Sequence, residues 1–401
     1  MTYDIDSVRA DFPALAGGSA HFDGPGGTQT PIAVIDAISA TLRGPLSNHG
    51  TITAGELRAE KTVIEAREAI ADLVGGDPRG VVFGRSATQL CYDFSRWISR
   101  SWTAGDEVVV TRLDHDSNIR PWVQAAERTG ATVRWLDFDP QTSELNEVGT
   151  VLSDRTRLVA VTGASNLIGT KPPVAAIAAA AHTAGAMVYV DGVHLTAHSH
   201  VDMAALGADF FACSPYKFLG PHLGALAASP ALLESLLPDK LLPSTNQVPE
   251  RFEFGTLPYE LLAGVAAAVN YLSTIGGGVT PDSSRRAQLT DAFERLEHHE
   301  DALLAQLEDG LAALPSVTVH SRAALRTPTL LLTIDGRDTV DAYRFLAARG
   351  VDAPSSNFYA LEASRRLGLG DEGGLRVGLA PYTNAGDVDR LLHALAAFLA
   401  A

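Results

Sequence analysis

The chain has 401 residues, of which 46% are hydrophobic and 19% are charged, so it can bury a sizeable core and wholesale disorder is excluded. Asp and Glu number 47 against 31 Lys and Arg, which gives a formal net charge of −16 at pH 7. This acidity, without any run of Lys and Arg to offset it, excludes nucleic acid as an expected partner.

The cysteine content and the N-terminal residues indicate the compartment. Only two cysteines occur, Cys91 and Cys213, which are too few for a disulfide framework or a four-thiolate metal site. The N-terminus carries acidic residues where a secretory signal needs a basic flank and an apolar core. We therefore expect a cytoplasmic protein.

Two long stretches lack Asp, Glu, Lys and Arg, at Pro172–Val190 and Leu261–Pro281. Polar residues and glycines interrupt both of them. The first stretch predicts a helix, a turn and a strand, and the second predicts a buried helix followed by a loop. No membrane span or membrane partner is therefore expected.

Short apolar runs alternate with helix-period segments over the first two thirds of the chain. The expected helices are Pro31–Arg43, Glu56–Val74, Ser86–Arg100, Ile119–Thr129 and Val174–Ala184. The apolar runs are mostly continuous, as in strands that are covered on both faces. They are Val81–Gly84, Val108–Thr111, Thr132–Leu136, Leu158–Gly163, Met187–Val190, Phe210–Cys213 and Leu223–Ala227. This alternation predicts an α/β fold with a mostly parallel sheet.

A break near Gly276–Gly278 precedes a second, smaller α/β unit. Its expected elements are a helix at Ser283–Leu314, a strand at Thr329–Ile334, a helix at Val340–Ala348, a strand at Leu375–Leu379, and a last helix from about Gly386 with Asn384 as its N-cap. We expect an N-terminal segment at residues 1–20 that packs on the small domain, a large domain at residues 21–280 and a small C-terminal domain at residues 281–401.

Polar residues follow the ends of five separate predicted strands. They are Arg85-Ser86-Ala87-Thr88, Asp114-His115 with Asn118, Ser165-Asn166, Asp191 with His194, and Ser214-Pro215-Tyr216-Lys217. The carboxyl ends of parallel strands share one edge of a sheet, and ligands bind at that edge. Polar residues after one strand are common in surface loops, but polar residues after five strands predict a single site.

These residue types suit pyridoxal phosphate. A lysine forms a Schiff base with the aldehyde of this cofactor, and a carboxylate pairs with its pyridine nitrogen so that the ring accepts electrons. A small-residue turn that opens a helix presents backbone N–H groups to a phosphate. A histidine can lie against the face of the ring.

The sequence also resembles the class V, fold-type I pyridoxal-phosphate enzymes, the cysteine desulfurase-like aminotransferases, from about Phe22 to the C-terminus. The matching stretches are RSATQ (85–89), LDHDSNIRPW (113–122), ASNLIGT (164–170), VYVDGVH (188–194), CSPYKFLGPHLG (213–224), FEFGT (252–256) and LRVGLAPYTNAGDVDRL (375–391). The resemblance implies a pyridoxal-phosphate enzyme with a large and a small domain, which acts on an amino acid as a homodimer.

The resemblance assigns roles to individual residues. Lys217 would form the Schiff base, Asp191 would pair with the pyridine nitrogen and His115 would stack on the ring. The remaining cofactor-binding residues would be Asn166 at the phenolic oxygen, Ala87, Thr88 and Ser214 at the phosphate, His194 and Tyr216 near the cofactor, and Thr256 at the phosphate of the neighbouring subunit. Arg376 would bind the substrate α-carboxylate.

Three departures from the desulfurase pattern bear on the reaction. Desulfurases carry a nucleophilic cysteine on a loop a little upstream of the Arg376 position, whereas residues 357–374 contain no cysteine. His194 stands where desulfurases usually have Gln. Pro215 and Tyr216 stand where many of them have Gly and His.

The histidines at 194, 198 and 200 also raise a zinc alternative. A zinc site needs three or four well-placed ligands, so we expect no metal and assign His194 to the cofactor instead.

The leading hypothesis is desulfurase-like or C–S lyase chemistry, through an external aldimine and removal of the Cα proton by Lys217. Because the loop thiol is missing, this reaction would need β-elimination or an external acceptor. The alternatives are a class V aminotransferase or an amino-acid epimerase, and a pyridoxal-phosphate-binding protein with little turnover.

Overall fold

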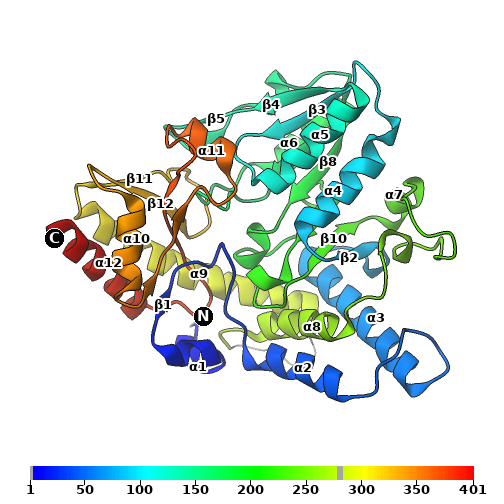
Figure 1. The fold of residues 1–401 in the computed structure, drawn as a ribbon, viewed down its shortest axis with the longest axis horizontal. Helices are drawn as coiled ribbons and strands as arrows, with labels where there is room; N and C mark the ends of the chain where they lie inside the picture. The colour runs from blue at the N-terminus through cyan, green and yellow to red at the C-terminus, as the bar shows by residue number, and fades with distance from the viewer. Residues whose placement is uncertain (1–2, 278–282) are drawn as a thin grey trace.

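The computed structural model describes residues 3–277 and 283–401 and contains a large and a small β-sheet (Figure 1). The large sheet has seven strands in the order β2-β10-β9-β8-β7-β3-β4. These strands are β2 (Val81–Gly84), β3 (Glu107–Thr111), β4 (Thr132–Leu136), β7 (Thr156–Thr162), β8 (Met187–Asp191), β9 (Phe210–Cys213) and β10 (Gly224–Ala228). All seven coincide with the apolar runs of the sequence to within two residues.

The large sheet is mostly parallel, as predicted. Neighbouring strands from β4 to β9 pair in parallel, whereas β10 is antiparallel to both β9 and β2. A continuous apolar run shows that a strand is covered on both faces, but it carries no information about the direction of the strand. For this reason the sequence could not single out β10.

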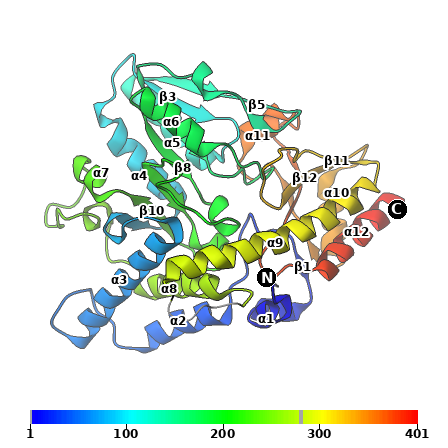
Figure 2. The same ribbon diagram turned by 180° about the vertical axis from the view of Figure 1, so that it is seen from behind.

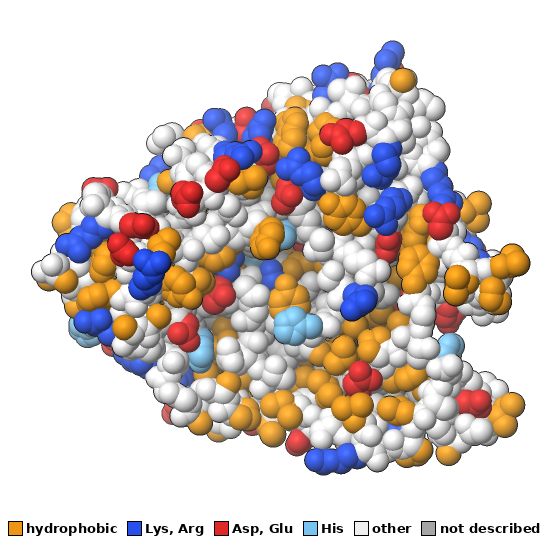
Figure 3. Space-filling model, viewed as in Figure 1, with side chains coloured by type: hydrophobic (Ala, Val, Ile, Leu, Met, Phe, Trp, Pro, Cys, Tyr) orange, Lys and Arg blue, Asp and Glu red, His pale blue; other side chains and the backbone are white. Residues whose placement is uncertain are grey.

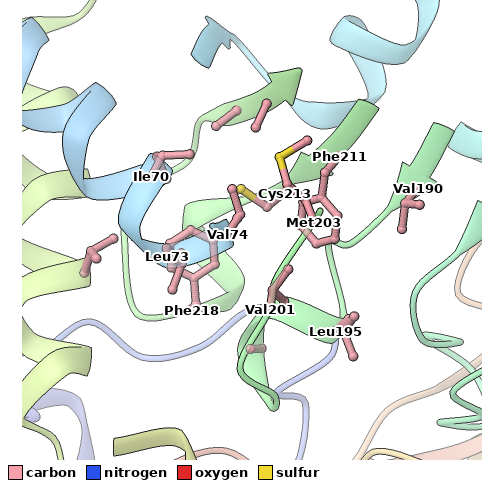
Figure 4. Close-up of a cluster of buried hydrophobic side chains, with 14 of the residues drawn as sticks. Ile70, Leu73, Val74, Val190, Leu195, Val201, Met203, Phe211, Cys213 and Phe218 are labelled. Carbon is pink, nitrogen blue, oxygen red and sulfur yellow. The ribbon is translucent and has the colours of Figure 1, made fainter. Parts of the chain in front are cut away.

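Helices cover both faces of the large sheet. One face packs on α4 (Ala87–Ile98) and α5 (Arg120–Thr129), where side chains such as Phe94 and Trp122 are buried. The other face packs on α3 (Ala54–Val74), α6 (Val174–Thr183) and α8 (Tyr259–Thr274). Figure 4 shows part of this second core, with Phe211, Cys213 and Phe218 close to side chains of α3.

The small sheet is antiparallel, with the order β11-β12-β15-β14. Its strands are β11 (Val317–Val319), β12 (Thr329–Ile334), β14 (Ser355–Ser356) and β15 (Gly374–Gly378). Its helices are α9 (Arg285–Ala312), α10 (Thr339–Ala347), α11 (Leu361–Arg366) and α12 (Ala385–Ala400). Figure 2 shows α9 running from α8 to the small sheet and α12. Asn384 caps α12 as predicted, in a capping box with Asp387.

The N-terminal segment contacts the C-terminal part of the chain. Arg9 of α1 (Ile5–Ala10) forms an ion pair with Asp387 at 2.7 Å. Strand β1 (Ala20–His21) pairs in parallel with β13 (Val351–Asp352). The predicted domain boundary after residue 280, and the end of the predicted break at Gly278, lie outside the described residues.

Helix α2 (Ile32–Arg43) packs on α8. The remaining strands and α-helices are short: β5 (Phe138–Asp139), β6 (Glu144–Leu145) and α7 (Pro230–Ser235).

The two uncharged stretches fold as expected where they are described. The first forms α6 and β8, and most of the second lies in α8. Among the helices of the described ranges, none is long and apolar enough to cross a membrane.

Candidate active site

A cavity of about 660 Å³ lies at the carboxyl ends of the large-sheet strands and adjoins a smaller inner cavity of about 60 Å³. The two share lining residues, among them His115, Asn166 and Lys217. The strand-end residues from β2, β3, β7, β8 and β9 therefore meet at one place. Those that line at least one of the cavities are Ser86, Ala87, Thr88, His115, Asn166, Asp191, His194, Ser214, Tyr216 and Lys217.

Lys217 presents a buried amine to both cavities. It ends a short turn after β9, in which its backbone N–H donates to the carbonyl of Ser214 at 3.0 Å. The next residue, Phe218, is anchored in the core beside the sheet (Figure 4). Only 7% of Lys217 is exposed, and burial, followed by repulsion from Arg376, lowers the pKa of its amine to about 8. The amine is therefore neutral over a larger part of the physiological range than an ordinary lysine.

Asp191 is the last residue of β8 and lines the inner cavity. Its Oδ1 accepts a hydrogen bond from the N–H of Val193 at 2.9 Å. Burial raises the pKa of this carboxyl, whereas the Val193 bond and the charge of Lys217 act in the opposite direction. A cationic N–H group in the cavity would therefore favour the ionised carboxylate.

His115 is held in one tautomer beside the shared part of the cavities. Its Nδ1 accepts a hydrogen bond from the backbone N–H of Ser117 at 3.1 Å and lies 2.8 Å from the Ser117 hydroxyl. Burial, followed by the charges of Lys217 and Arg376, lowers the pKa of the ring to about 3. The neutral imidazole therefore carries its hydrogen on Nε2.

The start of α4 provides backbone N–H groups at the inner cavity. The hydroxyl of Ser86 caps the helix by accepting from the N–H of Gln89, and Ala87 and Thr88 form the first turn. The first N–H groups of a helix have no partner within the helix and bind anions. Gly224 of β10 packs directly behind this turn, since a Cβ there would lie 2.3 Å from the carbonyl carbon of Ser86.

Arg376 of β15 places a buried guanidinium in the large cavity. One Nη donates to Asp23 at 2.5 Å, and the other donates to the backbone carbonyl of Asn166 at 3.0 Å. The ring of Phe358 lies over the guanidinium, 3.7 Å from the carbon Cζ. These three contacts fix the guanidinium and leave further N–H groups free for an anion.

One residue of the predicted site lies elsewhere. Thr256 is exposed and does not line these cavities; its hydroxyl lies 3.3 Å from Oδ1 of Asn48, beside a separate cavity of about 350 Å³. This position is compatible with the predicted role of Thr256 toward a neighbouring subunit, which stays a prediction.

The three neighbouring histidines have separate partners. Nε2 of His194 lies 2.9 Å from the hydroxyl of Thr327, and Nδ1 of His198 lies 2.9 Å from a carboxylate oxygen of Glu300. His200 contacts a threonine hydroxyl of α9. In residues 3–277 and 283–401, no group of three or more His, Cys, Asp and Glu side chains is placed to hold a metal ion.

Sequence reasoning missed several residues that line the large cavity. They are Asp23, Tyr92, Asp116, Ser117, Arg120, Ser356, Phe358 and Tyr359. Asp23 carries a signal, since it follows Phe22, where the resemblance begins. Phe358 and Tyr359 carry none, because they follow no predicted strand.

The cavity contains unpartnered polar atoms that fit the chemistry of pyridoxal phosphate. Oδ1 of Asn166 and Nδ1 of His194 are buried without a hydrogen-bond partner, although both residues line the inner cavity. Buried polar atoms of this kind call for a polar ligand. With the amine of Lys217, the carboxyl of Asp191 and the helix start at Ala87, they supply the groups that this cofactor requires.

The lowered pKa of Lys217 gives a testable prediction. The cofactor-free protein should condense with a small aldehyde at a rate that rises with pH around a midpoint near 8, whereas a free lysine has a pKa of about 10.4. Asp191→Asn removes a carboxylate that raises this pKa, so its midpoint should fall. Arg376→Gln removes a cation that lowers the pKa, so its midpoint should rise.

Absorbance at a series of pH values measures these rates. A Lys217→Ala protein supplies the background from the other three lysines and from the α-amino group, whose ordinary pKa is about 8. A wild-type midpoint near 10.4, or a shift of both variants in the same direction, would contradict the assigned environment of the amine.

Comparison with known proteins agrees with this geometry. The family model described as Aminotransferase class-V matches residues 20–391. An uncharacterised protein of Mycobacterium tuberculosis is 32% identical, and the alignment covers 99% of both chains. A cysteine desulfurase of Klebsiella pneumoniae is 31% identical over 98% of both chains, and an aminotransferase-like protein of Gibberella zeae is 29% identical over 98% of both.

Solved structures share the fold. The cysteine desulfurase CsdA of Escherichia coli superposes with a TM-score of 0.87 at 26% identity, covering 100% of this chain and 99% of that one. A structure at 22% identity and a TM-score of 0.77, covering 97% of this chain and 98% of that one, holds glycine covalently linked to its pyridoxal phosphate cofactor. Taken with the match over residues 20–391, these findings show that the chain is a cysteine desulfurase-like member of the aminotransferase class-V family.

Proposed function

We propose that the chain is a pyridoxal-phosphate enzyme that removes the Cα proton of an amino acid, with C–S lyase chemistry as its leading reaction. One observation carries the proposal: the buried amine of Lys217 opens into the same cavity as His115 and the fixed guanidinium of Arg376. Asp191 lines the adjoining inner cavity together with Lys217.

When bound, the cofactor supplies an aldehyde for the substrate amine and a ring that accepts the electron pair from Cα. Asp191 would hold a proton on the pyridine nitrogen, and His115, as a neutral ring, would lie against the cofactor without adding charge. Ala87, Thr88 and Ser214 would bind the phosphate, while Asn166, His194 and Tyr216 would contact the rest of the cofactor.

The substrate would be held at its carboxylate and deprotonated at Cα. Arg376 would bind the α-carboxylate through the N–H groups that Asp23 and Asn166 leave free. The neutral amine of Lys217 would then take the Cα proton. With the carboxylate held by Arg376 and the amino group held at the cofactor aldehyde, the Cα–H bond would be directed toward Lys217.

The two cysteines favour a reaction that needs no enzyme thiol. Cys91 and Cys213 are unpaired and buried in α4 and β9, and neither lines the cavities. Burial raises the pKa of the Cys213 thiol to about 12, so it is protonated and unreactive. Elimination, or sulfur transfer to an external acceptor, is therefore favoured over transfer to a cysteine of this chain.

Thiols that form no disulfide bond also fit the reducing conditions of the cytoplasm, which we propose as the location of the protein.

The function is tested by exchange at Cα. The protein loaded with pyridoxal phosphate should exchange the Cα hydrogen of at least one L-amino acid for deuterium in D₂O, followed by NMR. Lys217→Ala should lower the exchange rate by about 10²–10⁴-fold, the usual contribution of a positioned base. Lys171→Ala, which removes a lysine outside both cavities, is the matched control.

The products then separate the reactions. Pyruvate with a released thiol or sulfide indicates elimination, alanine with sulfide indicates desulfuration, and turnover that depends on 2-oxoglutarate indicates transamination. Loss of optical activity alone indicates epimerisation. Bound cofactor without exchange on any amino acid would contradict the proposal and leave a cofactor-binding protein with little turnover.

We also propose that the chain acts as a homodimer. Large hydrophobic side chains are exposed on α2, on the start of α3 and on the two adjoining loops: Ile35, Leu42, Leu46, Ile52, Leu57, Leu241, Leu242 and Phe254. Figure 3 shows hydrophobic side chains gathered over α2. A surface of this kind on a monomer marks an interaction site. Thr256 lies beside it, where a second copy would meet the residue.

Sedimentation should therefore give twice the chain mass. The double variant Ile52→Glu with Leu242→Glu should sediment as a monomer of unchanged helix content, because these side chains are 85% and 96% exposed within one chain. Wild-type protein that sediments as a monomer at micromolar concentration would contradict the dimer.

A further inference from the structure

The segment between β14 and α11 has an unusual backbone at the rim of the large cavity. Phe358 and Tyr359 are consecutive non-glycine residues in the left-handed region, with φ of 51° and 58°. This conformation is unfavourable for a residue with a side chain, and backbone strain of this kind persists only where the surroundings impose it.

Hydrogen bonds from the cavity rim impose this conformation. Nδ2 of Asn166 donates to the carbonyl of Phe358 at 3.0 Å, and the N–H of Asp116 donates to the carbonyl of Tyr359 at 2.7 Å. The N–H of Tyr359 donates in turn to Oδ1 of Asn357 at 2.9 Å. The loops after β3 and β7 therefore hold both strained residues against the site.

This backbone directs two aromatic rings to different parts of the cavity. Phe358 covers the guanidinium of Arg376, as described above. The ring centroid of Tyr359 lies 5.5 Å from that of His115. Tyr359 remains 72% exposed although it lines the cavity, so most of its surface is free to contact another molecule.

A second large polar side chain of the cavity wall, that of Arg120, already has a partner. Its guanidinium pairs with Asp116 at 2.9 Å. Tyr359 is more exposed than Arg120, whose side chain is 35% exposed, and the surface that it offers is aromatic. Aromatic faces bind apolar groups, other rings and divalent sulfur.

We propose that Tyr359 is a specificity-determining residue whose ring packs against the S-substituent of an S-substituted cysteine. This inference rests on the proposed function and names its substrate class. Arg376 holds the carboxylate of the substrate, Lys217 faces Cα, and Tyr359 forms the wall against the side chain. A cavity of about 660 Å³ has room for a substituent larger than the side chain of cysteine itself.

The reaction on such a substrate balances without an enzyme thiol or an oxidant. The amine of Lys217 takes the Cα proton, and the electron pair of that bond forms the Cα–Cβ double bond. The Cβ–S bond breaks with its electron pair on sulfur, and the thiolate takes up a proton from the Lys217 ammonium. Water then hydrolyses the released 2-aminoacrylate to pyruvate and ammonium.

The test uses the cofactor-loaded protein with S-phenyl-L-cysteine and S-methyl-L-cysteine. Tyr359→Ala should lower kcat/KM for the S-phenyl substrate by about 10–100-fold, the usual effect of removing an apolar contact of this size, and by less than about threefold for the S-methyl substrate. Tyr359→Phe should retain both values. Tyr343→Ala is the matched control, since Tyr343 is an exposed tyrosine of α10 outside the cavities.

Binding of the carbon isosteres gives a readout that does not depend on turnover. L-Homophenylalanine and L-norvaline replace the sulfur of the two substrates by CH₂ and cannot eliminate. The change in cofactor absorbance on binding gives their Kd. Tyr359→Ala should raise the Kd of homophenylalanine by the same 10–100-fold and leave that of norvaline nearly unchanged.

Each outcome decides the inference. Equal losses for both substrates would show that Tyr359 merely supports the loop, and no loss for either would show that it does not contact the substrate. Wild-type protein that exchanges the Cα proton of cysteine but neither binds homophenylalanine nor cleaves S-phenyl-cysteine would overturn this inference. The proposed function would still stand in that case. Wild-type protein inert toward every amino acid would overturn the proposed function as well.

Discussion

The removal of the Lys217 amine from water is the constraint on which the site depends. A buried ammonium is costly, so the folded chain lowers the pKa of this amine to about 8. Asp191 and Asp23 favour the charged form of the amine, and Arg376 disfavours it. The balance produces a group that is available both to condense with an aldehyde and to accept a proton near neutral pH.

The two sheets place the side chains that surround the amine of Lys217. Parallel strands bring their carboxyl ends to one edge, so short loops after β2, β3, β7, β8 and β9 place their side chains around one pair of cavities. The small sheet contributes Arg376 from β15 and the strained segment with Phe358 and Tyr359. Under the proposed function, the position of the small sheet would determine how the carboxylate and the side chain of a substrate meet the amine of Lys217.

The sequence predicted the features that follow from periodicity and strand order. Continuous apolar runs located every strand of the large sheet. After five of these strands at least one of the polar residues lines the cavities, whereas Arg85, Asp114, Asn118 and Ser165 line neither. The direction of β10 was not predictable, because burial on both faces does not depend on strand direction. Phe358 and Tyr359 were missed for a related reason. No local pattern marks a bulky residue with positive φ, since the hydrogen bonds that impose it come from Asp116 and Asn166, far away in the chain.

The most direct test of the account is the bond between cofactor and protein. The chain contains only four lysines, so borohydride reduction of the pyridoxal-phosphate-loaded protein, followed by digestion and mass spectrometry, assigns the attachment without ambiguity. We expect one reduced pyridoxyl group, on Lys217, and none on the Lys217→Ala variant. A modified Lys61, Lys171 or Lys240 with an unmodified Lys217, or no adduct at all, would contradict it.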